Sequence, residues 1–153
     1  MSDSDLEISR LLSAPRAKIW RAWSDAALLA EWWCPKPWQT TVRGFDMRPG
    51  GAFDTLMTGP NGETSDNPGI FLEIVPGERI VTTWMLTAGW RPATPWLGLT
   101  AIFTMADEGT GTRYTARALH RTAEEAQKHV DMGFHEGWGI CMDQLDAFAQ
   151  TLS

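Results

Sequence analysis

The sequence has few of the features that identify a class of protein directly, such as cysteine frameworks, membrane spans or signal peptides. Only two of its 153 residues are cysteines, Cys34 and Cys141, and they lie far apart, so we expect reduced thiols rather than a disulfide framework. No apolar run approaches the ~20 residues that a bilayer span requires. The opening MSDSDLEISR has no apolar signal-peptide core. We therefore expect a protein of the cytoplasm that has no membrane segment.

Clusters of basic residues are also missing. The lysines and arginines are scattered, the formal net charge is -6, and the isoelectric point is near 5.0. This balance argues against a nucleic-acid groove, which needs a basic face, and against a polybasic contact with a membrane. We expect neither nucleic acid nor membrane as a partner.

Catalytic and cofactor signatures are absent as well. The sequence contains no Gly-x-Ser-x-Gly elbow, no phosphate-binding glycine loop and no dinucleotide fingerprint. The two cysteines are not spaced for zinc, and His129 and His135 would lie about 120° apart around a helix. We expect no cofactor, no metal site and no assigned catalytic residue.

What the chain has in excess is tryptophan. Nine Trp stand beside six Phe and a single Tyr, and hydrophobic residues make up 43% of the sequence. A chain of 153 residues fits one domain, spanning 1–153, with a sizeable core. Because a compact core prefers side chains that interlock in fixed rotamers, the surplus of Trp fits the lining of a wide cavity or an exposed contact surface.

Hydrophobic patterning predicts a strand, two short helices, a run of strands and a long final helix. The first helix begins at Ser13-Ala14-Pro15, and Asp25 caps a second helix over 26–32. Short turns between successive strands favour an antiparallel meander. The expected strands cover residues 6–12, 38–47, 52–58, 69–75, 78–86, 97–106 and 113–120.

The last segment predicts one long helix over 123–152, capped by Thr122. Gly133 and Gly137 fall on its apolar face, where each glycine costs about 1 kcal/mol relative to alanine. Two glycines one turn apart leave a trough, into which either another backbone packs or a ligand fits. The residues that define this face at three- and four-residue steps are Ala126, Val130, Phe134, Cys141, Leu145, Phe148 and Leu152.

A curved antiparallel sheet of six or seven strands, wrapped around one long helix, has an inner and an outer face. Alternation points the small residues Ala101, Ala116 and Ala118 inward, opposite the two glycines. Empty space of that kind is destabilising, so we expect a cavity that holds a ligand or water. The residues expected to bind a ligand there are Phe53, Met57, Phe71, Trp84, Phe103, Tyr114, His120, Phe134 and Trp138.

Several polar residues have two interpretations each. His120 and Tyr114 point inward by alternation, so they would orient a ligand or move its proton. The more ordinary interpretation of His120 is a hydrogen-bonded histidine at the sheet edge. Glu73 would either enter the cavity or lie exposed. Asp46 and Arg48 share a strand face, and a salt bridge that stabilises the following turn explains them as well.

Six motifs follow one another along nearly the whole chain: Ser13-Ala14-Pro15, Ile19-Trp20-Arg21-Ala22-Trp23, Glu31-Trp32-Trp33-Cys34-Pro35, Asp46-Met47-Arg48-Pro49-Gly50-Gly51, Gly69-Ile70-Phe71-Leu72-Glu73-Ile74 and Gly137-Trp138. In this order they resemble the activator of heat-shock-protein-90 ATPase homologues (AHSA family), members of the START-like (SRPBCC) helix-grip superfamily. That superfamily also holds polyketide cyclases and plant allergens. The resemblance implies a helix-grip fold with a hydrophobic tunnel between sheet and long helix, and no universal catalytic residue.

Three classes of function remain open. The favoured one is a carrier or sensor that binds a small apolar molecule (a lipid, a polyketide or an aromatic metabolite) without chemistry. The second is a cyclase-like or hydrolytic enzyme, in which His120, Tyr114 or Glu73 acts inside the tunnel. The third, which the resemblance suggests, is a module that contacts a chaperone. In that case an exposed Trp33, Trp90 or Trp96 would form the contact, or a contact between two copies of the chain.

Overall fold

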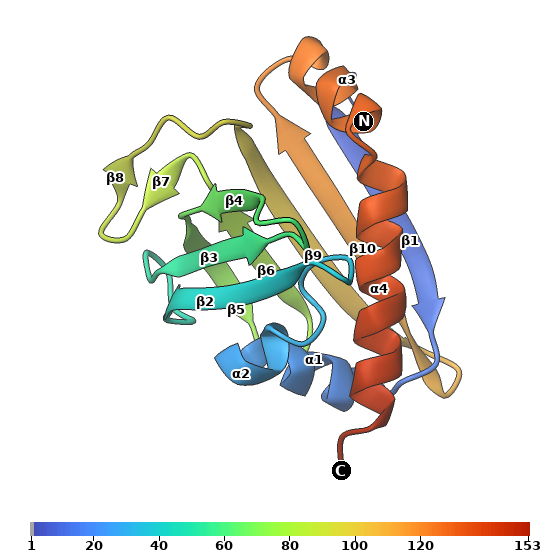
Figure 1. Ribbon diagram of the computed structural model, residues 1–153. Helices are drawn as coiled ribbons and strands as arrows, with labels where there is room; N and C mark the ends of the chain where they lie inside the picture. The colour runs from blue at the N-terminus through green and yellow to red at the C-terminus, as the bar shows by residue number, and fades with distance from the viewer. Residues whose placement is uncertain (1) are drawn as a thin grey trace.

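The computed structural model describes residues 2–153 and has an α+β architecture (Figure 1). The strands are β1 (Asp5–Leu12), β2 (Gln39–Phe45), β3 (Phe53–Thr58), β4 (Thr64–Asn67), β5 (Ile70–Val75), β6 (Arg79–Thr83), β7 (Leu86–Thr87), β8 (Arg91–Pro92), β9 (Leu99–Glu108) and β10 (Gly111–His120). The helices are α1 (Arg16–Ser24), α2 (Ala26–Leu29), α3 (Ala123–Asp131) and α4 (Phe134–Gln150).

The main strands form a strongly curved antiparallel sheet. One part has the order β1-β10-β9-β6-β5 and the other the order β2-β3-β4. The two parts meet where Ala52 bridges Ile70 and the Phe53 N–H donates to the Gly69 carbonyl at 2.8 Å. Since β4 and β5 are separated only by Pro68 and Gly69, both continue along the same side of β3. The predicted helix-grip fold is confirmed.

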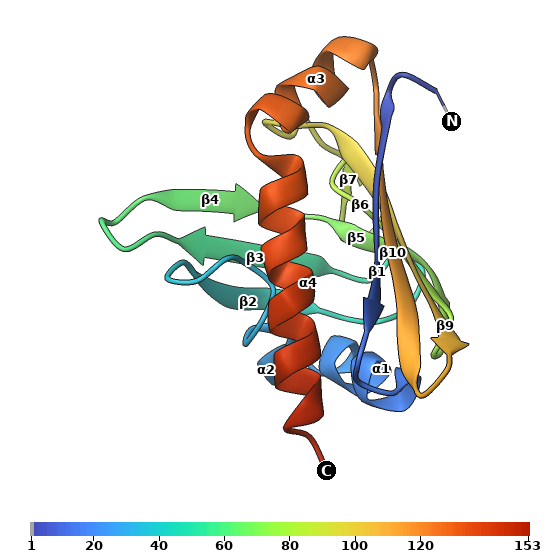
Figure 2. The same cartoon turned by 90° about the vertical axis from the view of Figure 1, so that its right-hand side faces the viewer.

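The predicted helix over 123–152 is two helices, α3 and α4. The break falls at Gly133, whose φ of 93° lies in the left-handed region that glycine adopts without a steric penalty. Gly133 therefore precedes α4 instead of lying inside it. Thr122 caps α3, because its side chain accepts the backbone N–H of Glu125. Figure 2 shows α4 running beside β1 and β10, with α3 at one end and α1 and α2 at the other.

The second short helix is shorter than predicted. Asp25 caps it as expected, since its carboxylate accepts the N–H groups of Ala27 and Leu28. The helix ends at Leu29 rather than Trp32, because the N–H groups of Glu31 and Trp32 bond carbonyls three residues back, those of Leu28 and Leu29, at 3.1 and 3.2 Å. This tighter turn brings Trp32 and Trp33 toward the interior.

Several strands also differ from the predicted set. The strand expected over 78–86 ends at Thr83, and the one expected over 38–47 covers only Gln39–Phe45. Strand β4 was not predicted, since Thr64–Asn67 is polar and carries no alternation. The two-residue strands β7 and β8 fall in a stretch where we expected a strand end and a loop.

The core lies between the inner face of the sheet, α1 and α4. Trp23 of α1 is fully buried, and its ring packs against Trp32, Trp33 and Phe103 at centroid distances of 5.4, 5.2 and 4.8 Å. Strand alternation holds on β10, where Tyr114 and its inward neighbours are buried. Within residues 2–153, no helix combines the length and the apolar character needed to cross a bilayer.

Candidate ligand-binding site

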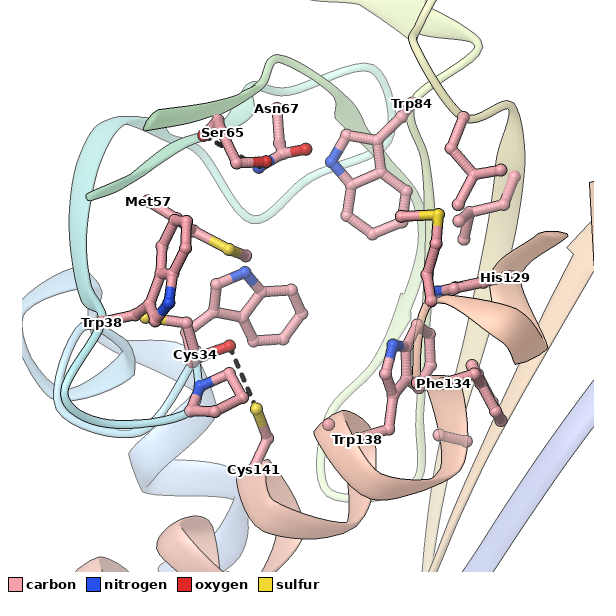
Figure 3. A pocket seen from close by; sticks show the side chains of 18 of the residues that line it. Cys34, Trp38, Met57, Ser65, Asn67, Trp84, His129, Phe134, Trp138 and Cys141 are labelled. Carbon is pink, nitrogen blue, oxygen red and sulfur yellow. Dashed lines mark hydrogen bonds between the residues drawn. The ribbon is translucent and has the colours of Figure 1, made fainter. Parts of the chain in front are cut away.

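A cavity of about 630 Å³ lies between the sheet and the helices α3 and α4 (Figure 3). Its wall combines the inner faces of β9 and β10, one side of α4, the segment between α2 and β2, parts of β3 and β4, and the loop before β9. Pockets for small molecules commonly have volumes of about 300–1,000 Å³ and mostly apolar walls. The cavity therefore has the size and the lining of a small-molecule site.

Six of the nine residues expected to bind a ligand line this cavity. Two come from β9 and β10, two from α4 and one from β3, and the sixth follows directly after β6. The glycines Gly133 and Gly137 line it too. The six residues are Met57, Trp84, Phe103, Tyr114, Phe134 and Trp138.

The other three predicted residues, Phe53, Phe71 and His120, do not line the cavity. Phe53 lies behind Trp33, at a centroid distance of 5.0 Å, and stacks on Phe71 at 4.8 Å. Alternation therefore gave the correct face of the sheet for these rings but not their depth. His120 is buried behind His129, which takes the position in the wall.

Both glycines border the cavity as predicted, but only Gly137 lies inside α4. A Cβ atom added there would meet nothing within 4 Å, so the absent side chain leaves open space beside the cavity. The neighbouring Trp138 lies nearly parallel to Phe103, with 14° between the ring planes and 5.9 Å between centroids. The two rings therefore stack on each other, and this stack joins β9 to α4 in the wall of the cavity.

Sequence patterns missed most of the remaining wall. Part of it comes from irregular or polar segments, which show no periodicity. His129 was considered only as a metal ligand, and the break at Gly133 turns it toward the sheet. The surplus of tryptophan was the one signal for this region. The missed residues include Trp32, Trp33, Cys34, Trp38, Ser65, Asn67, Trp96, Leu97, Leu99, His129, Cys141 and Met142.

Tyr114 already has a protein partner for its hydroxyl oxygen. The indole Nε1 of Trp23 donates to this oxygen at 2.9 Å in the buried core. Burial raises the pKa of Tyr114 well above its ordinary value, although the bond from Trp23 acts in the opposite direction. The hydroxyl therefore stays protonated near neutral pH and cannot act as a general base.

Two histidines form a connected pair at the α3 end of the cavity. Nε2 of His120 lies 2.8 Å from Nδ1 of His129, and Nδ1 of His120 lies 3.0 Å from the Ser4 carbonyl oxygen. Burial lowers the pKa of His129 to about 4, and the nearby His120 and His135 add to the effect. His129 is therefore neutral at pH 7.

Both free thiols line the cavity. The Thr40 hydroxyl donates to the sulfur of Cys34 at 3.0 Å, and the Cys141 thiol donates to the Trp33 carbonyl at 3.5 Å. Burial raises the pKa of both thiols, that of Cys141 to about 12, with the nearby Cys34 adding to this increase. Since the thiolate is the nucleophile, these protonated thiols are poor candidates for covalent catalysis.

Glu73 lies outside the cavity and pairs with Arg79 at the surface. The register of β5 shifts between Phe71 and Glu73, so Glu73 does not continue the inward alternation. Asp46 and Arg48 form the expected salt bridge, at 2.6 Å. Among residues 2–153, no group of three or more His, Cys, Asp or Glu side chains is placed to hold a metal ion.

A curved antiparallel sheet that encloses an apolar cavity against a C-terminal helix defines a helix-grip protein. The family described as "Activator of Hsp90 ATPase homolog 1-like protein" matches residues 13–150. The match covers most of the sequence, so the chain belongs to this family. None of the functionally curated proteins matches the chain.

Solved structures agree with this assignment. A protein from Nitrosomonas europaea is 39% identical, with 98% of this chain and 96% of that chain covered and a TM-score of 0.92. A protein from Mycobacterium smegmatis is 27% identical, with 99% and 93% covered and a TM-score of 0.81. An AHSA1-like protein from Aeromonas hydrophila is 21% identical, with 95% and 92% covered and a TM-score of 0.71, and shows the fold alone.

Proposed function

We propose that the protein binds a small apolar molecule in the cavity between the sheet and α4. The observation that carries this proposal is the open space at Gly137, which faces a wall of aromatic rings. The cavity is partly open to solvent, so a ligand that enters it displaces water and buries apolar surface with a gain of about 25 cal/mol per Å². Lipids, polyketides and aromatic metabolites are the candidate classes.

The wall favours binding over hydrolysis. Generic ester or phosphoester hydrolysis needs an activated nucleophile and groups that stabilise developing negative charge. The thiols of Cys34 and Cys141 and the hydroxyl of Tyr114 are all held in their protonated forms by burial, which raises their pKa values. Asp66, a charged residue of the cavity wall, pairs with Arg43. These groups suit a neutral ligand that stays intact.

Filling the cavity from Gly137 tests the proposal. The neutral dye N-phenyl-1-naphthylamine should bind the wild type with a rise in fluorescence. Gly137→Leu should abolish this rise, because the leucine side chain extends into the open space. Gly137→Ala is the matched control, since it adds one methyl group and should keep most of the binding. Unchanged dye affinity in a folded Gly137→Leu protein would overturn the proposal.

Native mass spectrometry of freshly purified protein would show whether a ligand is carried from the cell. A thermal-shift screen of lipids, polyketides and aromatic metabolites would then identify the class that binds. A ligand that binds only the folded state raises the melting temperature, and the increase grows with the logarithm of the free ligand concentration above Kd. If a screened compound is consumed, the result would instead favour a cyclase-like or hydrolytic enzyme.

A contact with a chaperone is the second candidate. The family description names an ATPase activator, and Trp90 and Trp96 are 53% and 54% exposed. Trp90 has a φ of 66°, and its ring lies so close to Gly50 that an added Cβ would come within 2.5 Å of it. A rigid, exposed tryptophan is typical of interface hot spots. Trp33, by contrast, is half-buried among aromatic rings and offers no such surface.

Purified Hsp90-type ATPase provides the test of this second candidate. The full chain should raise the rate of ATP hydrolysis, and Trp90→Ala should remove most of the increase while leaving dye binding unchanged. No change in the ATPase rate at a saturating amount of this protein would exclude a role as an activator of the chaperone.

A further inference from the structure

The hydrogen bonds of the histidine pair determine which nitrogens carry protons. A carbonyl oxygen only accepts, so Nδ1 of His120 must donate to Ser4. The Nε2 atom of a neutral His120 then has no proton and must accept the hydrogen from Nδ1 of His129, 2.8 Å away. A neutral His129 is thereby left with a bare lone pair on its own Nε2.

This lone pair belongs to a residue of the cavity wall. His129 lines the cavity, and Figure 3 shows it at the edge of the open space, between Trp84 and Trp138. The hydrogen bonds within residues 2–153 include none to Nε2 of His129. Among residues 2–153, the buried side-chain atoms without a partner are Thr82 Oγ1, Trp84 Nε1 and Arg117 Nε, so Nε2 of His129 is reached from the cavity. A ligand that donates to this nitrogen gains one hydrogen bond in place of a bond to water.

Aromatic neighbours hold the His129 ring in one orientation. Phe134 and Trp138 meet it nearly edge-on, at centroid distances of 5.0 and 5.8 Å and with 74° and 75° between the planes. His120 meets it on a third side, at 5.1 Å and 74°. With its ring clamped and its Nδ1 engaged, His129 presents an acceptor of fixed direction in an otherwise aromatic wall.

We propose that the His129–His120 pair selects aromatic ligands that carry an acidic hydroxyl, a phenol or an enol, which donates to Nε2 of His129. This inference rests on the proposed function, because it concerns a ligand in the same cavity. The flat walls around Trp138 and Phe103 favour a planar ring system, and the lone pair favours a strong hydrogen-bond donor. A carboxylate presents only acceptor oxygens, which suit the unpaired, buried Nε1–H of Trp84 in the same wall rather than Nε2 of His129. His120 is a positioning residue, which acts by fixing the tautomer of His129.

Three matched ligands test the selection at pH 7. We expect 2-naphthol to bind about 5- to 10-fold more tightly than 2-methoxynaphthalene or naphthalene, the gain of one hydrogen bond to an unpaired acceptor. In His129→Phe, which keeps a flat ring without the nitrogens, the three affinities should become equal. His135→Gln is the control, because His135 is exposed on α4 and outside the cavity wall, and it should keep the wild-type ratio.

The tautomer can be measured without a ligand. Long-range proton–nitrogen NMR of the three imidazole rings should show the hydrogen of His129 on Nδ1 in the wild type. In His120→Phe the ring of His129 loses its acceptor, so the hydrogen should redistribute to Nε2 and the preference for 2-naphthol should fall by several-fold. Loss of packing alone would weaken all three ligands equally.

Each outcome of these experiments is decisive. Equal binding of the three ligands by the wild type, or a 2-naphthol preference that survives in His129→Phe, would overturn the selection and leave the proposed binding function intact. Failure of all three ligands and of N-phenyl-1-naphthylamine to bind would overturn both. If His129→Phe does not fold, a wild-type His129 with its hydrogen on Nε2 would by itself refute the inference, and a hydrogen on Nδ1 together with the 2-naphthol preference would support it.

Discussion

The indole nitrogen of Trp23 donates to the hydroxyl oxygen of Tyr114 at 2.9 Å, which ties α1 to the inner face of β10. Both side chains are buried, so neither can exchange this bond for one to bulk water. The bond also fixes the Tyr114 ring in the wall of the cavity. Core stability and the shape of the site are therefore coupled at this pair.

Tyr114→Phe should destabilise the protein by about 1–3 kcal/mol, because it leaves the Trp23 N–H buried without an acceptor. Urea unfolding followed by circular dichroism measures the change. Trp23→Phe costs more, since it also removes packing volume, but it no longer leaves a donor unpaired. The double variant should lose less free energy of unfolding than the sum of the losses in the two single variants. Strict additivity would show that the bond contributes nothing.

The two glycines around the start of α4 should respond in opposite ways to alanine. Gly133→Ala should destabilise the protein by about 1–2 kcal/mol, since a φ of 93° is strained for any residue with a Cβ. Gly137→Ala should stabilise it by about 0.5–1 kcal/mol, because the residue is helical and the new methyl group enters open space. Thermal unfolding of both variants beside the wild type gives the two signs, and equal signs would contradict the structure.

These glycines also show which features of the structure the sequence pattern could predict. A 3.6-residue period predicted one helix with Gly133 and Gly137 on the same face. Both glycines line the cavity, but the period is the same whether the helix continues or restarts at a left-handed residue. Only Gly137 is inside a helix. Alternation placed Tyr114 and Phe103 inward for the same local reason, since the period of a strand is two.

Depth and non-periodic segments could not be predicted in the same way. Phe53 and Phe71 face inward, yet Trp33 comes from an irregular turn after α2 and lies between Phe53 and the cavity. Ser65 lies on a polar strand with no apolar alternation. The position of such residues is decided by long-range packing, which a local pattern does not encode.

The stability of the protein should fall between pH 7 and pH 4 because of His129. Burial lowers its pKa from an ordinary 6.5 to about 4 in the folded state. Within that interval the unfolded chain binds more protons than the folded one, so lowering the pH favours unfolding. The groups that face His129 are His120 of β10 and His135 of α4, and both add to the decrease.

Urea unfolding at half-unit steps of pH measures this dependence, which should amount to about 3 kcal/mol over the interval. In His129→Phe the slope should become shallower, because the side chain whose pKa burial lowers is gone. His135→Gln should change the slope little. A wild-type stability that is constant from pH 7 to pH 4.5 would contradict a buried, neutral His129.

The two thiols should react slowly while the protein is folded. Burial raises the pKa of Cys141 to about 12 and also raises that of Cys34, so the thiolate fraction at pH 8 is far below that of an exposed cysteine. Iodoacetamide should therefore label the native chain at least about tenfold more slowly than the chain in urea. Mass spectrometry of Cys34→Ser and Cys141→Ala would assign the rate to each thiol. Because both sulfurs line the cavity, saturation with N-phenyl-1-naphthylamine should slow labelling further, and native labelling at the unfolded rate would contradict their burial.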